Sequence, residues 1–117
     1  MILHISSRAD WAEAQRRGEV RAPSLDEVGF VHCSDFGSVT VPANAVYRGR
    51  DDLVLLVIDP AAVDVPVRWE PGVPEHPSGV WFPHVHGPVP VGAVVAVHDF
   101  PPSADGEFRL PAALAGH

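Results

Sequence analysis

The amino-acid sequence predicts an α+β fold in which helices pack on one side of a β-sheet. Apolar and alternating runs typical of strands recur along the chain, whereas helical spacing is found only in its first half. The 13 prolines and 10 glycines among 117 residues indicate many turns between short elements. We therefore expect a single domain over residues 1–117, with a core within residues 2–99 and a peripheral tail over residues 101–117.

The start of the chain predicts a strand followed by a helix. Residues 1–5 are typical of a strand, and either Ser6 or Ser7 can cap the next helix, because a serine hydroxyl accepts a backbone N–H of the first turn. The helix over residues 10–17 should end at Gly18, since glycine readily adopts the left-handed conformation that commonly ends helices.

The segment "GFVHCS" predicts a second strand over residues 29–34, after a loop that includes a short turn. Strict alternation would place Phe30, His32 and Ser34 on one face of this strand. Cys33 would lie on the opposite face, where we expect a small buried apolar side chain rather than a nucleophile.

The middle of the chain predicts a second helix and then strands. Apolar residues recur at helical spacing over residues 36–47, and Pro42 within this window must either kink the helix or begin it. The run "LVLLVI" over residues 53–58 predicts a strand buried on both faces, because no polar residue interrupts it. Two further strands are predicted over residues 65–70 and 93–100.

The charge of the chain argues against several classes of function. The formal net charge is −7, and nucleic-acid binding usually needs a basic face, so we expect no binding to bulk nucleic acid. All eight basic residues are arginine. This composition excludes Schiff-base chemistry on a lysine and a phosphate-binding loop of the Walker type.

Cysteine content and hydropathy indicate a cellular location. Cys33 is the single cysteine, so neither an intrachain disulfide nor a thiolate zinc site can form. No segment approaches the ~20 apolar residues that a membrane-spanning helix needs. We therefore expect a cytoplasmic protein that does not contact a membrane.

Two histidines two residues apart are the first candidates for chemistry. His84 and His86 lie in "WFPHVHGP", and in an extended segment their side chains would share a face, roughly 6.5–7 Å apart. Such a pair can bind a metal ion if a third ligand is supplied. Alternatively, Pro83 and Pro88 make this segment a loop, and the histidines fill polar gaps. The candidates for a third ligand are His4, His32, Asp59 and Glu70.

Other polar residues in the predicted strands allow more than one interpretation. His4 lies inside the first strand, where a buried imidazole needs a hydrogen-bond partner or a ligand. His32 can contact a ligand or bond to a neighbouring carbonyl, and Ser34 can cap the next helix. His32 and Ser34 lie along one strand, which differs from a hydrolase triad. Glu70 is either a catalytic carboxylate at a strand end or a solvated loop acid.

Four segments of the sequence together resemble one bacterial family. They are "LHISSRADWAEAQRRGEVRAPSLDEVGFVHCS", "DDLVLLVID", "VRWE" and "FPHVHGPVPVGAVVAV". Their order and spacing resemble the small bacterial family catalogued as domain of unknown function 952, over residues 2–99. That family commonly has a tyrosine at the position of His86, which weakens the metal hypothesis and makes His84 the stronger candidate of the pair.

The resemblance also implies a fold and a ligand. The fold of the family resembles that of ADP-ribosyltransferases, which are split, twisted β-sheets with a cleft for NAD or ADP-ribose. In such enzymes a histidine or arginine of the first strand holds the nicotinamide ribose, and His4 matches that position. Ser34 and Glu70 correspond more loosely to a supporting residue on a middle strand and to a late acid that orients the acceptor.

The leading hypothesis is an enzyme or binding protein with a histidine-lined cleft that acts on NAD or an ADP-ribose-like nucleotide, with transferase chemistry. Two alternatives stay open, a non-catalytic ligand-binding module and a histidine-dependent metalloenzyme. We nevertheless expect no transition metal in the purified protein and no cofactor other than NAD as a substrate. The expected catalytic residues are His4, His32, Glu70 and His84, and the expected substrate-binding residues are Phe30, Ser34, Trp81 and His86.

Overall fold

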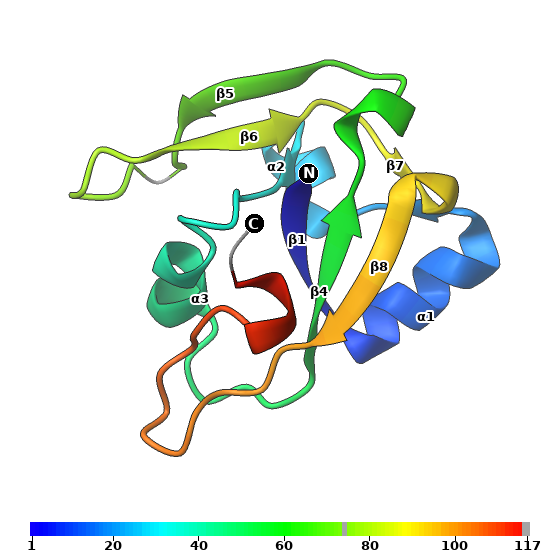
Figure 1. Cartoon of the computed structure of the whole chain (residues 1–117). Coiled ribbons are helices and arrows are strands. Elements are labelled where there is room, and N and C mark those ends of the chain that lie inside the picture. Colours follow the sequence, from blue (N-terminus) through cyan, green and yellow to red (C-terminus); the bar gives the residue numbers. More distant parts are fainter. Residues whose placement is uncertain (74, 116–117) are drawn as a thin grey trace.

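The computed structural model describes residues 1–73 and 75–115 of the chain. Figure 1 shows short strands with helices around them. None of the described helices has the length and apolar character needed to cross a membrane. The strands are β1 (Ile2–Ser7), β2 (Glu19–Val20), β3 (Val31–His32), β4 (Leu53–Ile58), β5 (Val67–Pro71), β6 (Trp81–Val85), β7 (Val89–Pro90) and β8 (Val94–Asp99). The helices are α1 (Arg8–Arg17), α2 (Pro23–Val28) and α3 (Thr40–Val46), with 3₁₀ turns η1 (Pro60–Ala62), η2 (Val91–Ala93) and η3 (Ala112–Leu114).

Antiparallel sheets make up the β-structure of the described residues. The longest strands form a sheet of order β1-β4-β8, in which Ile2 lies opposite Ile58 and Ser7 opposite Leu53. A second sheet has the order β3-β6-β5, and β2 pairs with β7. The predicted mixed α+β class is confirmed.

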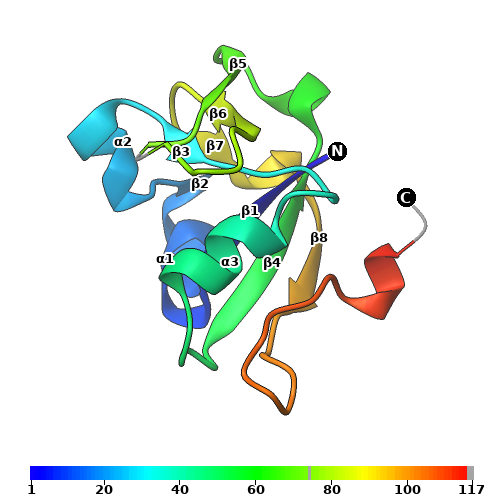
Figure 2. The same ribbon diagram turned by 90° about the vertical axis from the view of Figure 1, so that its left-hand side faces the viewer.

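A backbone bridge joins the first sheet to the second. The N–H of Leu3 donates to the carbonyl of Ser34, and the N–H of Ser34 donates to the carbonyl of Leu3, each at 2.7 Å. Figure 2 shows the second sheet lying across one end of the first. β3 is shorter than the strand predicted over residues 29–34, because the chain leaves β6 after His32 to meet β1.

The segment that contains the two neighbouring histidines forms a strand over residues 81–85, so its interpretation as a proline-bounded loop is wrong there. This strand, β6, lies between β3 and β5. Pro83 has no backbone N–H, which makes proline rare in the middle of a sheet. It pairs with Trp69 of β5 at a level where β3 has already left the sheet, so β6 has a neighbour on one side only at this residue.

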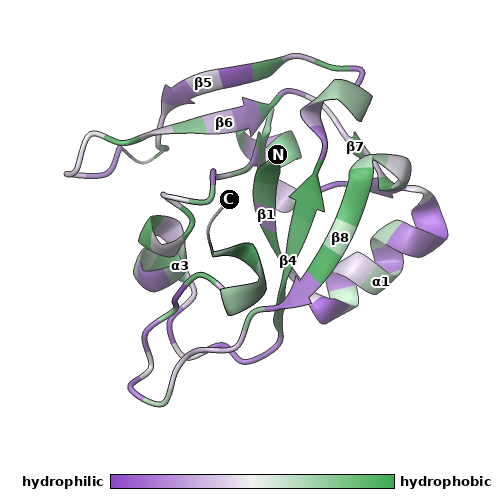
Figure 3. Cartoon of the chain, viewed as in Figure 1, coloured by the Kyte–Doolittle hydropathy of each residue, from purple (hydrophilic) through white to green (hydrophobic). Residues whose placement is uncertain are grey.

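Apolar clusters lie on both faces of the sheet β1-β4-β8, although Val95 and Val97 of the edge strand β8 are exposed. All six residues of β4 are buried, as the sequence predicted. Val54 and Leu56 lie in one apolar cluster with residues of β3 and β6, whereas Leu53 and Leu55 lie in a second cluster with residues of α3. The apolar colouring of β1, β4 and β8 in Figure 3 follows from this arrangement. The prediction of a sheet packed on one side is therefore wrong.

The helices differ from prediction mainly in length. The hydroxyl of Ser7 accepts a backbone N–H of the first turn at 3.0 Å, and Gly18 ends α1 at φ 92°. The predicted serine cap and the predicted glycine end are therefore both confirmed. α1 already begins at Arg8. α3 is shorter than the helix predicted over residues 36–47, and Pro42 is its third residue. The first N–H groups of a helix have no intrahelical acceptor, so proline is accommodated there.

Residues 101–115 place two side chains in the core, so the prediction of a purely peripheral tail is wrong for this segment. Phe108 and Leu114 are 1% and 5% exposed. Both pack with Phe100 in the second apolar cluster. Without these side chains, the face of the first sheet that contacts α3 would be open to water.

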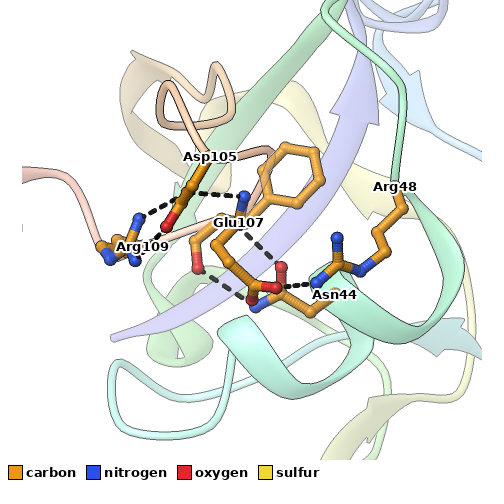
Figure 4. Close-up of polar contacts among 6 residues, drawn as sticks. Asn44, Arg48, Asp105, Glu107 and Arg109 are labelled. Atoms are coloured by element: carbon orange, nitrogen blue, oxygen red, sulfur yellow. Dashed lines mark hydrogen bonds and ion pairs between the residues drawn. The ribbon is translucent and has the colours of Figure 1, made fainter.

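Polar contacts fasten this C-terminal segment to α3 (Figure 4). The side-chain amide of Asn44 donates to the carbonyl of Phe108 at 3.1 Å and accepts the N–H of Phe108 at 2.8 Å. Arg48 forms an ion pair with Glu107 beside it. The C-terminal segment is therefore held to α3 and to the residues that directly follow it.

We expect Phe108→Ala to lower the free energy of unfolding by about 3–5 kcal/mol, because a buried phenyl ring is replaced by a cavity. Urea unfolding measures this difference. The matched control is Arg109→Ala, since the neighbouring Arg109 side chain is 59% exposed and its removal should change stability by less than about 0.5 kcal/mol. Equal free energies of unfolding for the two variants would contradict this prediction and would support a peripheral C-terminal segment.

Candidate functional site

A cluster of rings and one carboxylate lies on the second sheet. The pairing of β3 with β6 places His32 opposite His84. The ring of Phe30 lies 4.9 Å from that of His32 and 5.4 Å from that of His86, between centroids. Glu70 of β5 bonds to His84 of β6 and to His86, which directly follows β6. The structure thus brings together five of the predicted residues, which come from three separate segments of sequence.

His84 is the most enclosed member of the cluster. Its side chain is 1% exposed. The ring of Phe30 stacks on it at 3.8 Å between centroids and an interplanar angle of 8°, and the ring of His32 meets it edge-on at 5.6 Å. Nδ1 of His84 bonds to Oε1 of Glu70 at 3.0 Å. Nε2 of His84 is buried and has no hydrogen-bond partner among the described residues.

One carboxylate oxygen fixes the imidazoles of both His84 and His86. Oε1 of Glu70 lies 3.0 Å from Nδ1 of His84 and 2.7 Å from Nε2 of His86. Hydrogen bonds from His86 and His84 lower the pKa of Glu70, so its carboxylate is ionised at neutral pH and can only accept. Burial lowers the pKa of His84 despite the carboxylate. Neutral His84 therefore carries its proton on Nδ1, which leaves a lone pair on Nε2.

His4 is held at the place where the two sheets join. Its side chain is buried, and its Nδ1 lies 2.6 Å from the backbone carbonyl of His32. A carbonyl can only accept, so Nδ1 of His4 carries the proton and Nε2 has a lone pair. Burial lowers the pKa of His4, which favours this neutral form at neutral pH. The expectation that a histidine inside the first strand has a hydrogen-bond partner is confirmed.

A cleft of about 410 Å³ opens beside this junction. It is bounded by β1, by the chain from His32 to Ser34, by α3 and by the segment after β5. His4, His32 and Ser34 line it, together with many apolar side chains. The exposed His32 ring is partly desolvated, which lowers its pKa, and the neighbouring His84 and His4 oppose a positive charge there. His4 and His32 are therefore uncharged at neutral pH, and the lining also includes the carboxylate of Glu75.

The remaining predicted residues are not part of the cleft lining. Glu70, His84 and His86 lie in the ring cluster just described. Phe30 is 6% exposed and stacks on His84, so its ring is not free to stack on a ligand. Trp81 is 56% exposed at the start of β6. Neither Phe30 nor Trp81 lines this cleft, so neither is placed to stack on a ring of a ligand bound there.

A second hollow of about 320 Å³ adjoins the cleft and shares His4, Ile5 and Tyr47 with it. Its lining is more polar, because it runs along α1 and the loop that precedes α2. Each of its arginines also lies within 3.6 Å of a carboxylate. These arginines are Arg17, Arg21 and Arg50.

Sequence reasoning missed Tyr47 and His76, which also line the cleft. The helical spacing assigns Tyr47 to a helix interior, and His76 follows a loop without a recognisable motif, so neither carries a local signal. Burial raises the pKa of Tyr47, which keeps its hydroxyl protonated. Burial also raises the pKa of the Cys33 thiol to about 12. Cys33 is thus a small buried side chain, as expected, and not a thiolate.

A metal centre needs three or more suitable ligands around one point. Within residues 1–73 and 75–115, no group of three or more His, Cys, Asp and Glu side chains is arranged to hold a metal ion. His84 and His86, the pair that suggested such a centre, are instead joined through Oε1 of Glu70.

Comparisons with known proteins give a family and a structural relative. A family model described as a protein of unknown function (DUF952) matches residues 5–97. The crystal structure of protein CC0527 from Caulobacter crescentus is 30% identical in sequence, with a TM-score of 0.81 and 93% of each chain covered. The solution NMR structure of CC0527 is 32% identical, with a TM-score of 0.77 and with 97% of this chain and 96% of that chain covered. No curated protein matches the chain.

We expect acid to destabilise the protein partly through His4. Its pKa in the folded state is lower than the ordinary value of 6.5, so the unfolded chain binds the proton first as the pH falls. The free energy of unfolding should therefore fall below about pH 6.5 and level off once the pH passes the lowered pKa. His4→Asn keeps a donor for the His32 carbonyl but does not titrate, so it should weaken this pH dependence.

Urea unfolding at about pH 7.5 and about pH 5.5 measures the effect. Ser6→Ala is the control, because Ser6 is also buried on β1 but carries no titratable group. A pH dependence that is the same in His4→Asn and in the control would contradict the prediction.

Proposed function

The chain belongs to the DUF952 family of proteins of unknown function, and we propose that it binds a small nucleotide-like molecule, with NAD or ADP-ribose as first candidates, in the cleft beside His4. The observation that carries the proposal is the fixed, neutral imidazole of His4. Its Nδ1–H is held by the His32 carbonyl at 2.6 Å, which leaves Nε2 as an acceptor of fixed orientation. A ribose hydroxyl is a suitable donor for such an acceptor.

The size and lining of the cleft support a ligand of this class. Its volume of about 410 Å³ lies within the range of roughly 300–1,000 Å³ that small-molecule sites occupy. Apolar side chains such as Phe82 and Val41 alternate with a few polar groups, among them Ser34 and Tyr47. Binding sites for flat rings joined to sugars have this composition, because the rings need apolar contact and the sugars need directed hydrogen bonds.

The adjoining hollow offers cations for phosphate groups. A ligand that extends past His4 and Tyr47 would leave the apolar cleft and reach the hollow lined by Arg17, Arg21 and Arg50. These arginines would have to share their N–H groups between their present carboxylate partners and the ligand. Guanidinium groups have five N–H donors each, so such sharing is chemically reasonable.

The arrangement of the sheets is compatible with an ADP-ribosyltransferase-like fold. Two antiparallel sheets joined only between Leu3 and Ser34 in the described chain correspond to a split sheet, and a histidine of the first strand lies at the join. On this basis we propose transfer of an ADP-ribosyl group as the reaction class. His4 would hold the ribose. Glu70 would act through the histidines to which it is hydrogen-bonded, His84 and His86.

A non-catalytic binding module is the second candidate, and the position of Glu70 favours it. Glu70 does not line the cleft, and its Oε1 already accepts two hydrogen bonds from His84 and His86. In its present position this carboxylate does not reach a ribose in the cleft. A binding module would retain affinity for nucleotides and release no nicotinamide from NAD.

We expect NAD or ADP-ribose at saturating concentration to raise the melting temperature by several degrees, since a ligand at about 100 times its Kd adds about 2.7 kcal/mol of stability. His4→Asn should weaken binding roughly fivefold in titration calorimetry, the effect of one lost hydrogen bond of about 1 kcal/mol. His98→Asn, on β8 and outside both linings, is the control variant.

Release of nicotinamide, followed by NMR, separates the two candidates. Release that depends on His4 supports the transferase, and binding without release supports the module. If neither NAD nor ADP-ribose raises the melting temperature, both candidates are wrong for nucleotides of this class.

A further inference from the structure

The buried Nε2 of His84 is an acceptor without a partner. His84 donates through Nδ1 to Glu70 and is covered by the ring of Phe30. Nε2 has no hydrogen-bond partner within residues 1–73 and 75–115 and no contact with solvent. Buried polar atoms are nearly always paired, so an exception at a well-packed ring calls for an explanation.

Strands β3 and β5 flank β6 on opposite sides, and each carries a side chain that contacts the ring of His84. Nδ1 of His84 is turned to Glu70 on β5. On the other side, the ring of His32, the cross-strand partner of His84, meets His84 edge-on at 5.6 Å between centroids. His32 is exposed and lines the cleft. A rotation of the His32 side chain would therefore open the ring of His84 to the cleft.

We propose that His84 is the general base of the cleft and takes a proton from a hydroxyl group of a bound molecule once the His32 side chain turns aside. In this step an O–H bond breaks and an N–H bond forms at Nε2. The electron pair of the broken bond stays on the oxygen, which becomes the nucleophile. The positive charge on the ring is balanced by the ionised carboxylate of Glu70, which still accepts the Nδ1–H.

This inference rests on the proposed function only for the identity of the electrophile. With NAD, the oxygen would bond to the ribose carbon that carries nicotinamide, nicotinamide would leave with the electron pair of the broken C–N bond, and the proton would pass from Nε2 to solvent. Glu70 is then a positioning residue. It fixes the tautomer of His84 and does not touch the substrate.

His86 does not suit the same role, although it shares Glu70 with His84. The nitrogen through which it contacts the carboxylate is Nε2, at 2.7 Å, and its ring is tilted by 51° from that of Phe30 rather than stacked. A phenol at this position could donate the same hydrogen bond to Glu70. His86 is therefore a second residue that holds the carboxylate of Glu70 in position.

Chemical labelling tests access to His84 without any ligand. Diethyl pyrocarbonate acylates unprotonated imidazole nitrogens, and peptide mass spectrometry reports the rate at each histidine of the full-length protein. His32→Ala should increase the labelling rate of His84 several-fold, because the ring that separates His84 from the cleft is removed. His76→Ala, which removes another cleft histidine, should leave the rate unchanged.

His32→Gln serves as a second variant if His32→Ala does not fold. A His84 that stays equally unreactive in a folded His32 variant overturns the proposal. Nitrogen NMR of the histidine rings gives a second readout. Nδ1 of His84 should be protonated in the wild-type protein, and this preference should weaken in Glu70→Gln; a ring protonated on Nε2 at neutral pH would also overturn the proposal.

Kinetics with NAD separate two hypotheses, that His84 is the general base and that the ligand is a nucleotide such as NAD. His84→Gln should lower kcat for nicotinamide release with little change in KM, whereas His4→Asn should raise KM. An unchanged kcat in His84→Gln overturns the base. If NAD is inert while labelling of His84 depends on His32, the nucleotide proposal fails and the base is supported for a different substrate.

Discussion

The structure depends on the pair of backbone hydrogen bonds between Leu3 and Ser34. Because these bonds draw the chain toward β1, β3 ends after two residues and the second sheet lies across the end of the first. The same turn brings the carbonyl of His32 to Nδ1 of His4. The cleft, the fixed imidazole of His4 and the exposed position of His32 are thus consequences of one short join, rather than of separate devices.

The same join also allows a proline inside β6. After β3 leaves, β6 can include Pro83 without losing a ladder partner on that side, and the strand continues to His84. Two neutral imidazoles result, that of His4 at the join and that of His84 beside Glu70. Burial is the common physical cause, since it lowers the pKa of both His4 and His84. A site of this kind can accept protons or hydrogen bonds at neutral pH but does not attract anions by itself.

Much of the local structure could be predicted from sequence because it depends on local signals. The cap of α1, its glycine end and the doubly buried β4 are examples, and the alternation of "GFVHCS" placed Phe30 and His32 on the face that meets His84. Distant contacts could not be predicted in this way. No pattern links Glu70 to His84 and His86, or Asn44 to Phe108, because those contacts depend on how strands cross and not on spacing.

The C-terminal segment also bears on the order in which the chain can acquire its structure during synthesis. Asn44 and Phe108 are separated by 64 positions, and Leu114 must emerge from the ribosome before the second apolar cluster is complete. Until then, α3 and one face of the first sheet present bare apolar surface while translation proceeds at roughly 5–20 residues per second. The nascent chain would therefore depend on protection from aggregation until the segment that carries Phe108 and Leu114 has emerged.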